Sequence, residues 1–217
     1  MDAAKEIATK LLIYRDTVEY LNLISAADYF SGNFSSLIEN ALKVNQSDSS
    51  NIEATYNLIT GYLYQRDYDR ALVIIERLES QFSKCELPLT AHYNIGYVYL
   101  KKGRNDKAQY HLKGAKGKYK KTLLSEAVHP LKNNSNICQA ITYAIIDNKK
   151  KAFEHLDNSR EENPKTLPIV TALKNHPAID NLRSDPRFQE ILKEIETNYL
   201  KEHEKTGRLI TNYKPEN

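Results

Sequence analysis

A self-similar segment that occurs twice constrains the fold of this chain more than any other feature of its sequence. The residues from Tyr93 to Ala108 align without a gap on those from Tyr56 to Ala71. Such repetition is typical of proteins built from small stacked units, each of which packs on its neighbours. The matched pairs are Tyr56/Tyr93, Asn57/Asn94, Leu58/Ile95, Tyr62/Tyr99 and Ala71/Ala108.

Two looser copies fit the same frame, one on either side of the clear pair. The earlier copy contains Leu37 and Ala41, and the later one contains Ala152 and Leu156. About ten extra residues near 123–132 interrupt the array before the last copy. The sequence therefore predicts a half-repeat followed by four repeats, over residues 1–17, 18–51, 52–85, 89–122 and 133–166.

Each repeat has the pattern of a helical hairpin. Apolar residues recur at i, i+3, i+4 and i+7 twice per unit, and a short polar turn separates the two runs. Small residues recur where the paired helices would cross, which allows their axes to approach to about 8–9 Å. The predicted turns are Ser31-Gly-Asn33, Arg66-Asp67, Gly103-Arg-Asn105 and Asn148-Lys149, and the small residues are Ser25, Gly96, Ala140, Ala71, Ala108 and Ala152.

This pattern resembles that of tetratricopeptide-repeat (TPR) proteins, most clearly over residues 52–85 and 89–122. The resemblance implies an all-α, right-handed superhelical solenoid of helix-turn-helix hairpins. The sequence departs from the family pattern at Thr55 and His92, where an aromatic residue is frequent, and at Ile59, where a small residue is usual.

Residues 167–199 have the pattern of C-terminal capping helices. Ser184 or Asp185 is expected to N-cap a helix that begins at Pro186. Phe188, Ile191, Leu192 and Ile195 would form its apolar stripe. The stretch resembles the end of TPR regions in multidomain bacterial signalling proteins, which implies sensing or scaffolding rather than catalysis. Residues 200–217 are expected to form a polar, frayed tail.

The composition excludes several classes of protein. Hydrophobic residues make up 41% and charged residues 27% of the 217, which excludes a largely disordered chain. No apolar run approaches the ~20 residues that a membrane-spanning helix needs. Cys85 and Cys138 stand far apart in the sequence, and an acidic residue, Asp2, stands where a secretory signal would be basic. We therefore expect a cytoplasmic protein without membrane insertion.

The sequence contains no pattern of catalysis or of metal binding. Neither a phosphate-binding glycine loop nor a nucleophile elbow is present, and the six histidines form no HExxH pair. A lone helical histidine is more often a surface or boundary residue than a ligand. We therefore expect no enzymatic activity, no cofactor and no metal.

The first helices of the two clear repeats supply a candidate peptide-binding groove. In stacked hairpins these helices line one face, and side chains one turn apart project together. Asparagine amides can donate to and accept from a peptide backbone, and tyrosines add apolar area and a hydroxyl. Packing within the hairpins is the alternative role for the tyrosines. The candidate residues are Tyr56, Asn57, Thr60, Tyr64, Tyr93, Asn94, Tyr97 and Lys101.

A basic zone at residues 101–121 holds nine cationic residues and a single acidic one, although the net charge of the whole chain is only +3. It can be a solvated surface, a site for an acidic protein, or a nonspecific nucleic-acid site. Its excess of lysine over arginine disfavours specific nucleic-acid binding. The candidate patch comprises Lys101, Lys102, Arg104, Lys113, Lys116, Lys118, Lys120 and Lys121.

The sequence as a whole predicts a non-enzymatic scaffold that binds a peptide or protein segment in its concave groove. The sites where TPR proteins clamp a C-terminal carboxylate are Asn22, Ala26 and Thr90 here, which disfavours binding of chaperone tails. The alternative is a regulatory or homo-oligomerising domain of a larger bacterial signalling protein, such as a cyclase, kinase or transcriptional regulator.

Overall fold

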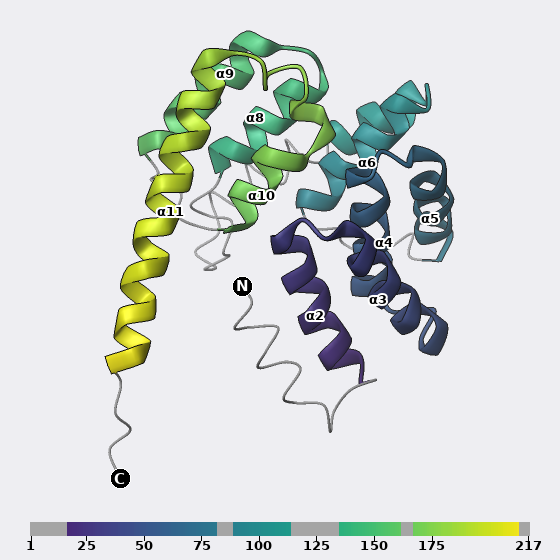
Figure 1. The fold of residues 1–217 in the computed structure, drawn as a ribbon. Helices are drawn as coiled ribbons and strands as arrows, with labels where there is room; N and C mark the ends of the chain where they lie inside the picture. The colour runs from purple at the N-terminus through teal and green to yellow at the C-terminus, as the bar shows by residue number, and fades with distance from the viewer. Residues whose placement is uncertain (1–16, 82–88, 114–134, 162–166, 213–217) are drawn as a thin grey trace, which may run out of the picture. The chain divides into compact units, whose positions relative to one another are not determined.

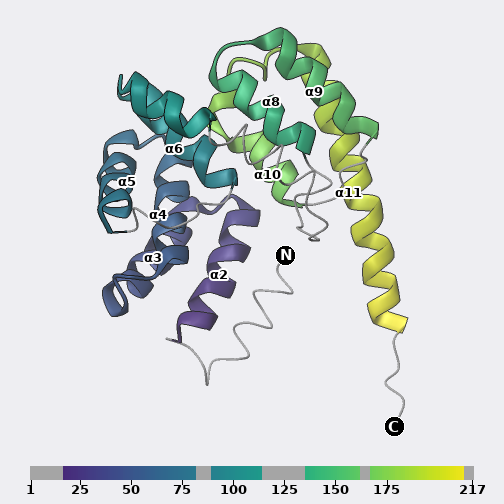
Figure 2. The same ribbon diagram turned by 180° about the vertical axis from the view of Figure 1, so that it is seen from behind.

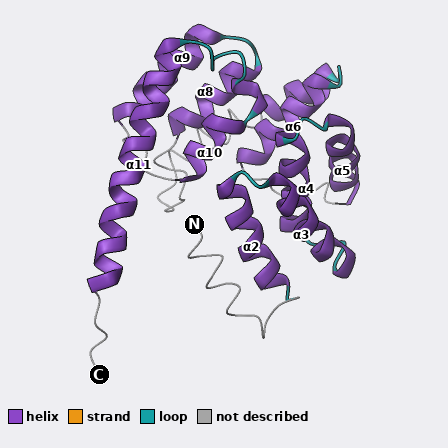
Figure 3. Ribbon diagram, in the orientation of Figure 1, coloured by secondary structure: helices purple, strands orange, loops and turns teal. Residues whose placement is uncertain are grey.

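The computed structural model describes residues 17–81, 89–113, 135–161 and 167–212, and these contain helices, turns and no strand (Figures 1–3). The chain divides into two compact units. The first comprises residues 1–125 together with 175–177, and the second comprises residues 126–174 and 178–217. The predicted half-repeat at 1–17 lies outside the described residues except for Thr17.

The first unit is built from helices that pack on their neighbours along the chain. α2 packs on α3, α3 on α4, and α4 on both α5 and α6, while α5 also contacts α6. Residues 105–113 form one more helix. This order gives three successive helix-turn-helix pairs, as the sequence predicts. The bounds are α2 (Val18–Ser31), α3 (Phe34–Ser47), α4 (Ile52–Tyr64), α5 (Tyr68–Gln81) and α6 (Leu89–Lys101).

The second unit contains one more hairpin and the helices that follow it. α8 packs on α9, and α9 packs on the long helix α11. The unit buries Leu156, Phe188 and Ile195, none of which is more than 1% exposed. The bounds are α8 (Ser135–Ile145), α9 (Lys149–Glu161), α10 (Leu167–Asn175), the short helix η3 (Pro177–Ile179) and α11 (Pro186–Asn212), although Asn175 and Pro177 group with the first unit.

The four hairpins within the described ranges turn with the same backbone geometry. One residue in each turn has a positive φ: Gly32 (73°), Arg66 (62°), Gly103 (68°) and Asp147 (55°). The next residue donates its N–H to a carbonyl five positions back, as in a Schellman C-cap. These bonds, 2.8–2.9 Å long, join Asn33 to Asp28, Asp67 to Tyr62, Arg104 to Tyr99 and Asn148 to Tyr143. The turns therefore lie where the repeat frame predicts them, and the residue five positions after each positive-φ residue is Leu37, Ala71, Ala108 or Ala152.

The same turns begin the second helix of three hairpins. The side-chain oxygen of Asn33 accepts from the N–H of Ser36, that of Asp67 from Arg70, and that of Asn148 from Lys151. A short side chain that accepts from an N–H three residues on satisfies a free donor of the first helical turn. In these three hairpins the single residue after the positive φ thus closes one helix and caps the next.

Small residues allow the helices to cross closely. Ser25, Ala71, Ala108, Ala140 and Ala152 are each no more than 1% exposed. A Cβ added to Gly96 would lie 3.0 Å from the side chain of Leu112, and a Cβ added to Gly61 would overlap the Cγ1 of Ile38. The glycines of α4 and α6 therefore lie where another helix leaves no room for a methyl group.

Helix α11 begins and packs as predicted but extends further along the chain. The Asp185 carboxylate accepts from the N–H of Arg187 at 2.9 Å and so caps the helix. Phe188, Ile191 and Ile195 are buried, and Leu192 is half-buried. The helix continues to Asn212, so residues 200–212 are helical rather than frayed. The lysines and glutamates of this stretch have high helix propensity, which supports helix without burial.

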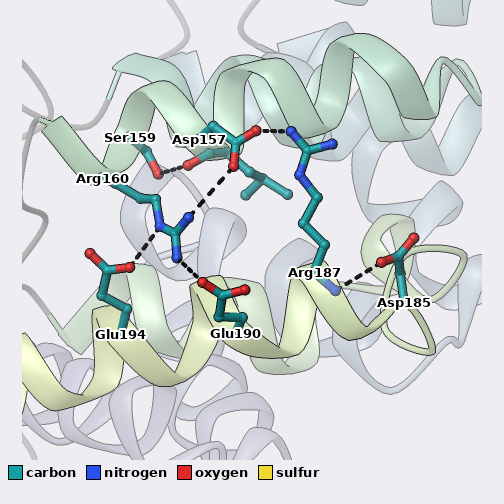
Figure 4. A network of polar contacts seen from close by, with 8 residues as sticks. Asp157, Ser159, Arg160, Asp185, Arg187, Glu190 and Glu194 are labelled. Atoms are coloured by element: carbon teal, nitrogen blue, oxygen red, sulfur yellow. Dashed lines mark hydrogen bonds and ion pairs between the residues drawn. The ribbon is translucent and has the colours of Figure 1, made fainter.

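A network of ion pairs fastens α11 to α9 in the second unit (Figure 4). The Arg160 guanidinium donates to Glu194 at 2.6 Å and to Glu190 at 2.7 Å, and lies 3.9 Å from Asp157. Arg187 donates to the other oxygen of Asp157. These hydrogen bonds, first that to Glu190 and then that to Glu194, raise the pKa of Arg160 above its ordinary value. Two arginines and three carboxylates thus join the faces of two helices.

No helix in the described ranges has both the length and the apolar character that crossing a membrane requires.

Replacing Gly61 by alanine should destabilise the first unit. The added methyl group overlaps the base of the Ile38 side chain, and overpacking of this kind costs about 1–3 kcal/mol, more than the ~1 kcal/mol that alanine gains in helix propensity. Urea denaturation of Gly61→Ala, Ile38→Ala and the double variant measures the coupling. Gly61→Ala should be neutral or stabilising once Ile38 is alanine. An equal loss in both backgrounds would contradict the proposed overlap.

Arg160→Met should lower the melting temperature, because it leaves Glu190, Glu194 and Asp157 together without the cation that joins them. We expect a loss of about 1–2 kcal/mol, which corresponds to a few degrees for a chain of this size, and a smaller loss in 1 M salt. Arg104→Met is the matched control, since its ion pair with Glu76 is exposed and 4.0 Å long. Equal effects of the two substitutions would show that the network adds nothing to an ordinary surface pair.

Candidate functional site

The predicted groove residues lie on α4 and α6, and the structure divides them by burial. Tyr56, Asn57 and Thr60 on α4 are half-buried, and Lys101 at the end of α6 is exposed. The remaining four are buried, with exposed fractions of 4% for Tyr64, 6% for Tyr93, 7% for Asn94 and 5% for Tyr97. One half of the predicted groove is therefore accessible, and the other half is covered.

The side chain of His176 lies among the four buried residues. Its ring centroid is 5.4 Å from that of Tyr64 and 5.7 Å from those of Tyr93 and Tyr97. Its Nε2 lies 3.0 Å from Oδ1 of Asn94, although the two residues are 82 positions apart in the sequence. His176 is fully buried and, with Asn175 and Pro177, groups with the first unit. We call these four residues of α4 and α6 the histidine pocket.

The geometry of the histidine pocket defines how it holds the imidazole. An amide oxygen only accepts hydrogen bonds, so Nε2 of His176 carries the hydrogen and donates it to Asn94. The Tyr64 and Tyr93 rings meet the imidazole at 81° and 68°, and edge-to-face contact of this kind is favourable between aromatic rings. The pocket thus provides aromatic contacts to the imidazole ring and a hydrogen-bond acceptor for its Nε2.

Tyr64 also connects the histidine pocket to aromatic residues of α2 and the α3 N-terminus. Its hydroxyl lies 3.3 Å from that of Tyr29, and its ring centroid is 4.7 Å from that of Phe34. Tyr29 and Phe34 also contact each other edge to face. These contacts fix one wall of the pocket from two further helices.

The sequence gives no clear signal for the role of His176, and three of the histidines are buried rather than at a surface or boundary position. His92, His111 and His176 are 8%, 3% and 0% exposed. The only local signal for His176 is the proline that follows it, which disfavours helical backbone at the preceding residue. That signal ends α10 at Asn175 but says nothing of where the imidazole lies.

A second polar cluster lies on the other side of α6, centred on Glu79. One oxygen of this carboxylate accepts from the Tyr99 hydroxyl at 2.8 Å and from Lys107 Nζ at 2.9 Å. The other lies 3.0 Å from Nε2 of His111, whose Nδ1 faces Nδ1 of His92 at 3.3 Å. A carboxylate only accepts, so His111 donates through Nε2 and, when neutral, accepts from His92.

The cluster shifts the titration of its members. Burial lowers the pKa of His111, and its hydrogen bond to Glu79 opposes this without cancelling it. Burial raises the pKa of the Tyr99 hydroxyl to about 12, with a further contribution from its hydrogen bond to Glu79. Burial would raise the pKa of Glu79, but hydrogen bonds from Lys107, Tyr99 and His111 hold it below its usual value. The cluster therefore favours a neutral His111 and an ionised Glu79.

The described part of the predicted basic zone faces acidic residues of α5. Lys102 donates to Asp69 at 2.5 Å, Arg104 lies 4.0 Å from Glu76, and Lys107 donates to Glu79. Lys101 lies over the Tyr97 ring, 5.2 Å from its centroid, and Lys113 is exposed. Much of the positive charge is therefore paired within the first unit. Lys116, Lys118, Lys120 and Lys121 lie outside the described residues.

Within the ranges that the structure describes, no cluster of three or more His, Cys, Asp or Glu side chains is suited to hold a metal ion. Cys138 is buried, and Cys85 lies outside those ranges.

No protein-family model matches this chain, and no curated protein matches its sequence. The histidine pocket and the Glu79 cluster are therefore interpreted from their own geometry.

Stability should fall as the pH falls from 7 to 5, and His111 should account for much of the change. Its pKa in the folded chain is below the unfolded value of 6.5, so the unfolded state binds the extra proton and acid favours unfolding. We expect a measurable loss of unfolding free energy from this residue over that range, determined by urea denaturation. His111→Gln should flatten the dependence more than His203→Gln, which replaces an exposed histidine of α11. An unchanged slope in His111→Gln would contradict the assignment.

Proposed function

We propose that the first unit is a non-enzymatic binding module that holds a peptide or protein segment against α4 and α6. The observation that carries this proposal is the presence of Asn175, His176 and Pro177 within the first unit, with the His176 side chain enclosed by α4 and α6. A surface that already holds three residues from a distant part of the chain has the shape and chemistry to hold such a segment.

The half-buried part of the face supports the same proposal. Asn57 and Thr60 lie on α4 one turn apart and lead toward Tyr64, which forms part of the histidine pocket. Their amide and hydroxyl groups can pair with the backbone of an extended segment, and neither is fully buried. A bound segment would therefore extend from the histidine pocket along α4.

The paired charges of the basic zone favour this face over a nucleic-acid site. Affinity for phosphate backbones comes from cations that are free to replace counterions. Lys102, Arg104 and Lys107 instead neutralise the α5 carboxylates. A phosphate would have to compete with those intramolecular partners, so protein segments are the better class of ligand.

We also propose that the hairpins form a right-handed TPR-like solenoid with α11 as its cap. The common turn geometry of the four hairpins supports this proposal, as do the small residues at the helix crossings. The packing of α11 on α9 is what a capping helix would require. In such an array one row of first helices forms a continuous face, which is the face proposed here for binding.

The proposed function can be tested by selecting peptides from a displayed random library on the immobilised full-length chain. Selected peptides should bind the chain with micromolar affinity, and Asn57→Ala/Thr60→Ala should weaken them about tenfold or more because it removes the polar groups of the accessible half. The melting temperature should change little, since both side chains are partly exposed.

Val73→Ala/Ser80→Ala provides the matched control, because both residues are exposed on α5 rather than on the proposed face. This control should bind the selected peptides like the wild type. Recovery of peptides whose affinity is the same for all three chains, or recovery of none, would count against the α4 and α6 face.

A further inference from the structure

The occupant of the histidine pocket is placed there by a particular local sequence. Pro177 has no N–H to donate and disfavours helical backbone at the residue before it. Helix α10 accordingly ends at Asn175, and His176 lies outside any helix, followed directly by η3. A histidine followed by proline is thus presented as a projecting side chain on a short non-helical segment.

The pocket selects the imidazole by two requirements that few side chains meet together. The three tyrosine rings contact a flat ring at centroid distances of 5.4–5.7 Å, which suits an aromatic side chain. Oδ1 of Asn94 requires a donor at the edge of that ring. A phenyl ring meets the first requirement but leaves the buried amide oxygen unpaired, which costs free energy.

The walls of the pocket are held independently of the occupant. Tyr64 is fixed by Tyr29 and Phe34, and Tyr97 contacts Tyr68 edge to face with 6.0 Å between ring centroids. Tyr93, Asn94 and Tyr97 lie within the regular helix α6. A site whose walls are preorganised in this way loses little entropy when a ligand side chain enters.

From these observations we propose that the histidine pocket is a recognition site for a histidine side chain within a His-Pro peptide segment. In this chain His176 occupies the site, and a second polypeptide segment with the same chemistry competes for it. The inference rests on the proposed binding role of the α4 and α6 face and names the ligand class of its buried half. Because His176 is tethered, it competes at an effective concentration of the order of millimolar and weakens binding of any other segment.

The first experiment empties the site in the full-length chain with His176→Gly and supplies imidazole as the probe. Millimolar imidazole should raise the melting temperature of His176→Gly by several degrees and leave the wild type unchanged. The matched control is His155→Gly, which removes a half-buried imidazole that stacks on Tyr143 and contacts Asn136 at 2.8 Å. Equal stabilisation of both glycine variants, or none of His176→Gly, would overturn the proposal.

The second experiment titrates a labelled peptide with the sequence of residues 172–180 and follows its fluorescence anisotropy. The peptide should bind His176→Gly at least tenfold more tightly than it binds the wild type, because the tethered competitor is gone. A peptide with phenylalanine in place of histidine should bind at least tenfold more weakly, since it leaves Asn94 unpaired. Equal affinity of the two peptides would overturn the proposal.

A third variant keeps the proposal testable if His176→Gly does not fold, which circular dichroism would reveal. His176→Phe fills the pocket with a ring that lacks the N–H donor, so the histidine peptide should displace it more easily than it displaces His176. Peptide affinity no greater for His176→Phe than for the wild type would overturn the proposal.

The outcome of these experiments on the His176 variants is independent of the outcome of the library selection. Selected peptides that depend on Asn57 and Thr60 support binding along the accessible half of the face whether or not the buried half is specific for histidine. Loss of that dependence removes the general binding role, whereas equal binding of the histidine and phenylalanine peptides removes only the histidine specificity.

Discussion

Close packing of each hairpin on its neighbours is the constraint on which the rest of the first unit depends. A single hairpin has two apolar faces and covers only one of them, so each must bury the other against the next. The approach is close enough that a methyl group on Gly61 would overlap Ile38. This packing sets the spacing of α4 and α6, and that spacing in turn determines whether an aromatic side chain fits between their tyrosines.

Helix α6 connects the two polar sites of the first unit. Tyr93, Asn94 and Tyr97 contact His176, whereas His92 and Tyr99, two helical turns apart, belong to the Glu79 cluster. The cluster holds α6 against α5 and the helix at 105–113 through hydrogen bonds, of which the one between His111 and His92 requires a neutral His111. The position of α6, and so the shape of the histidine pocket, therefore depends on buried polar groups as well as on apolar packing.

Counting charges along the sequence does not show which of them form ion pairs in the folded chain. Residues 101–121 form a strongly basic stretch in sequence, yet Asp69, Glu76 and Glu79 bring negative charge to it from α5. In the sequence these residues appear only as separate charges on separate helices. The packing of the helices brings them together as ion pairs. The described part of the zone is therefore largely an intramolecular contact between adjacent hairpins.

The hairpins and their turns could be predicted from the sequence because local forces determine them. Apolar periodicity, the residue at positive φ and the capping Asn or Asp all act within a few positions, and Gly32 with Asn33 shows the last two of these signals. The α11 start at Pro186 follows from the same local chemistry of Asp185. The burial of Tyr93, Asn94 and Tyr97 could not be predicted, since they contact His176, which is 82 positions from Asn94 in the sequence. That contact depends on the path of the chain in space, which local periodicity and capping do not specify.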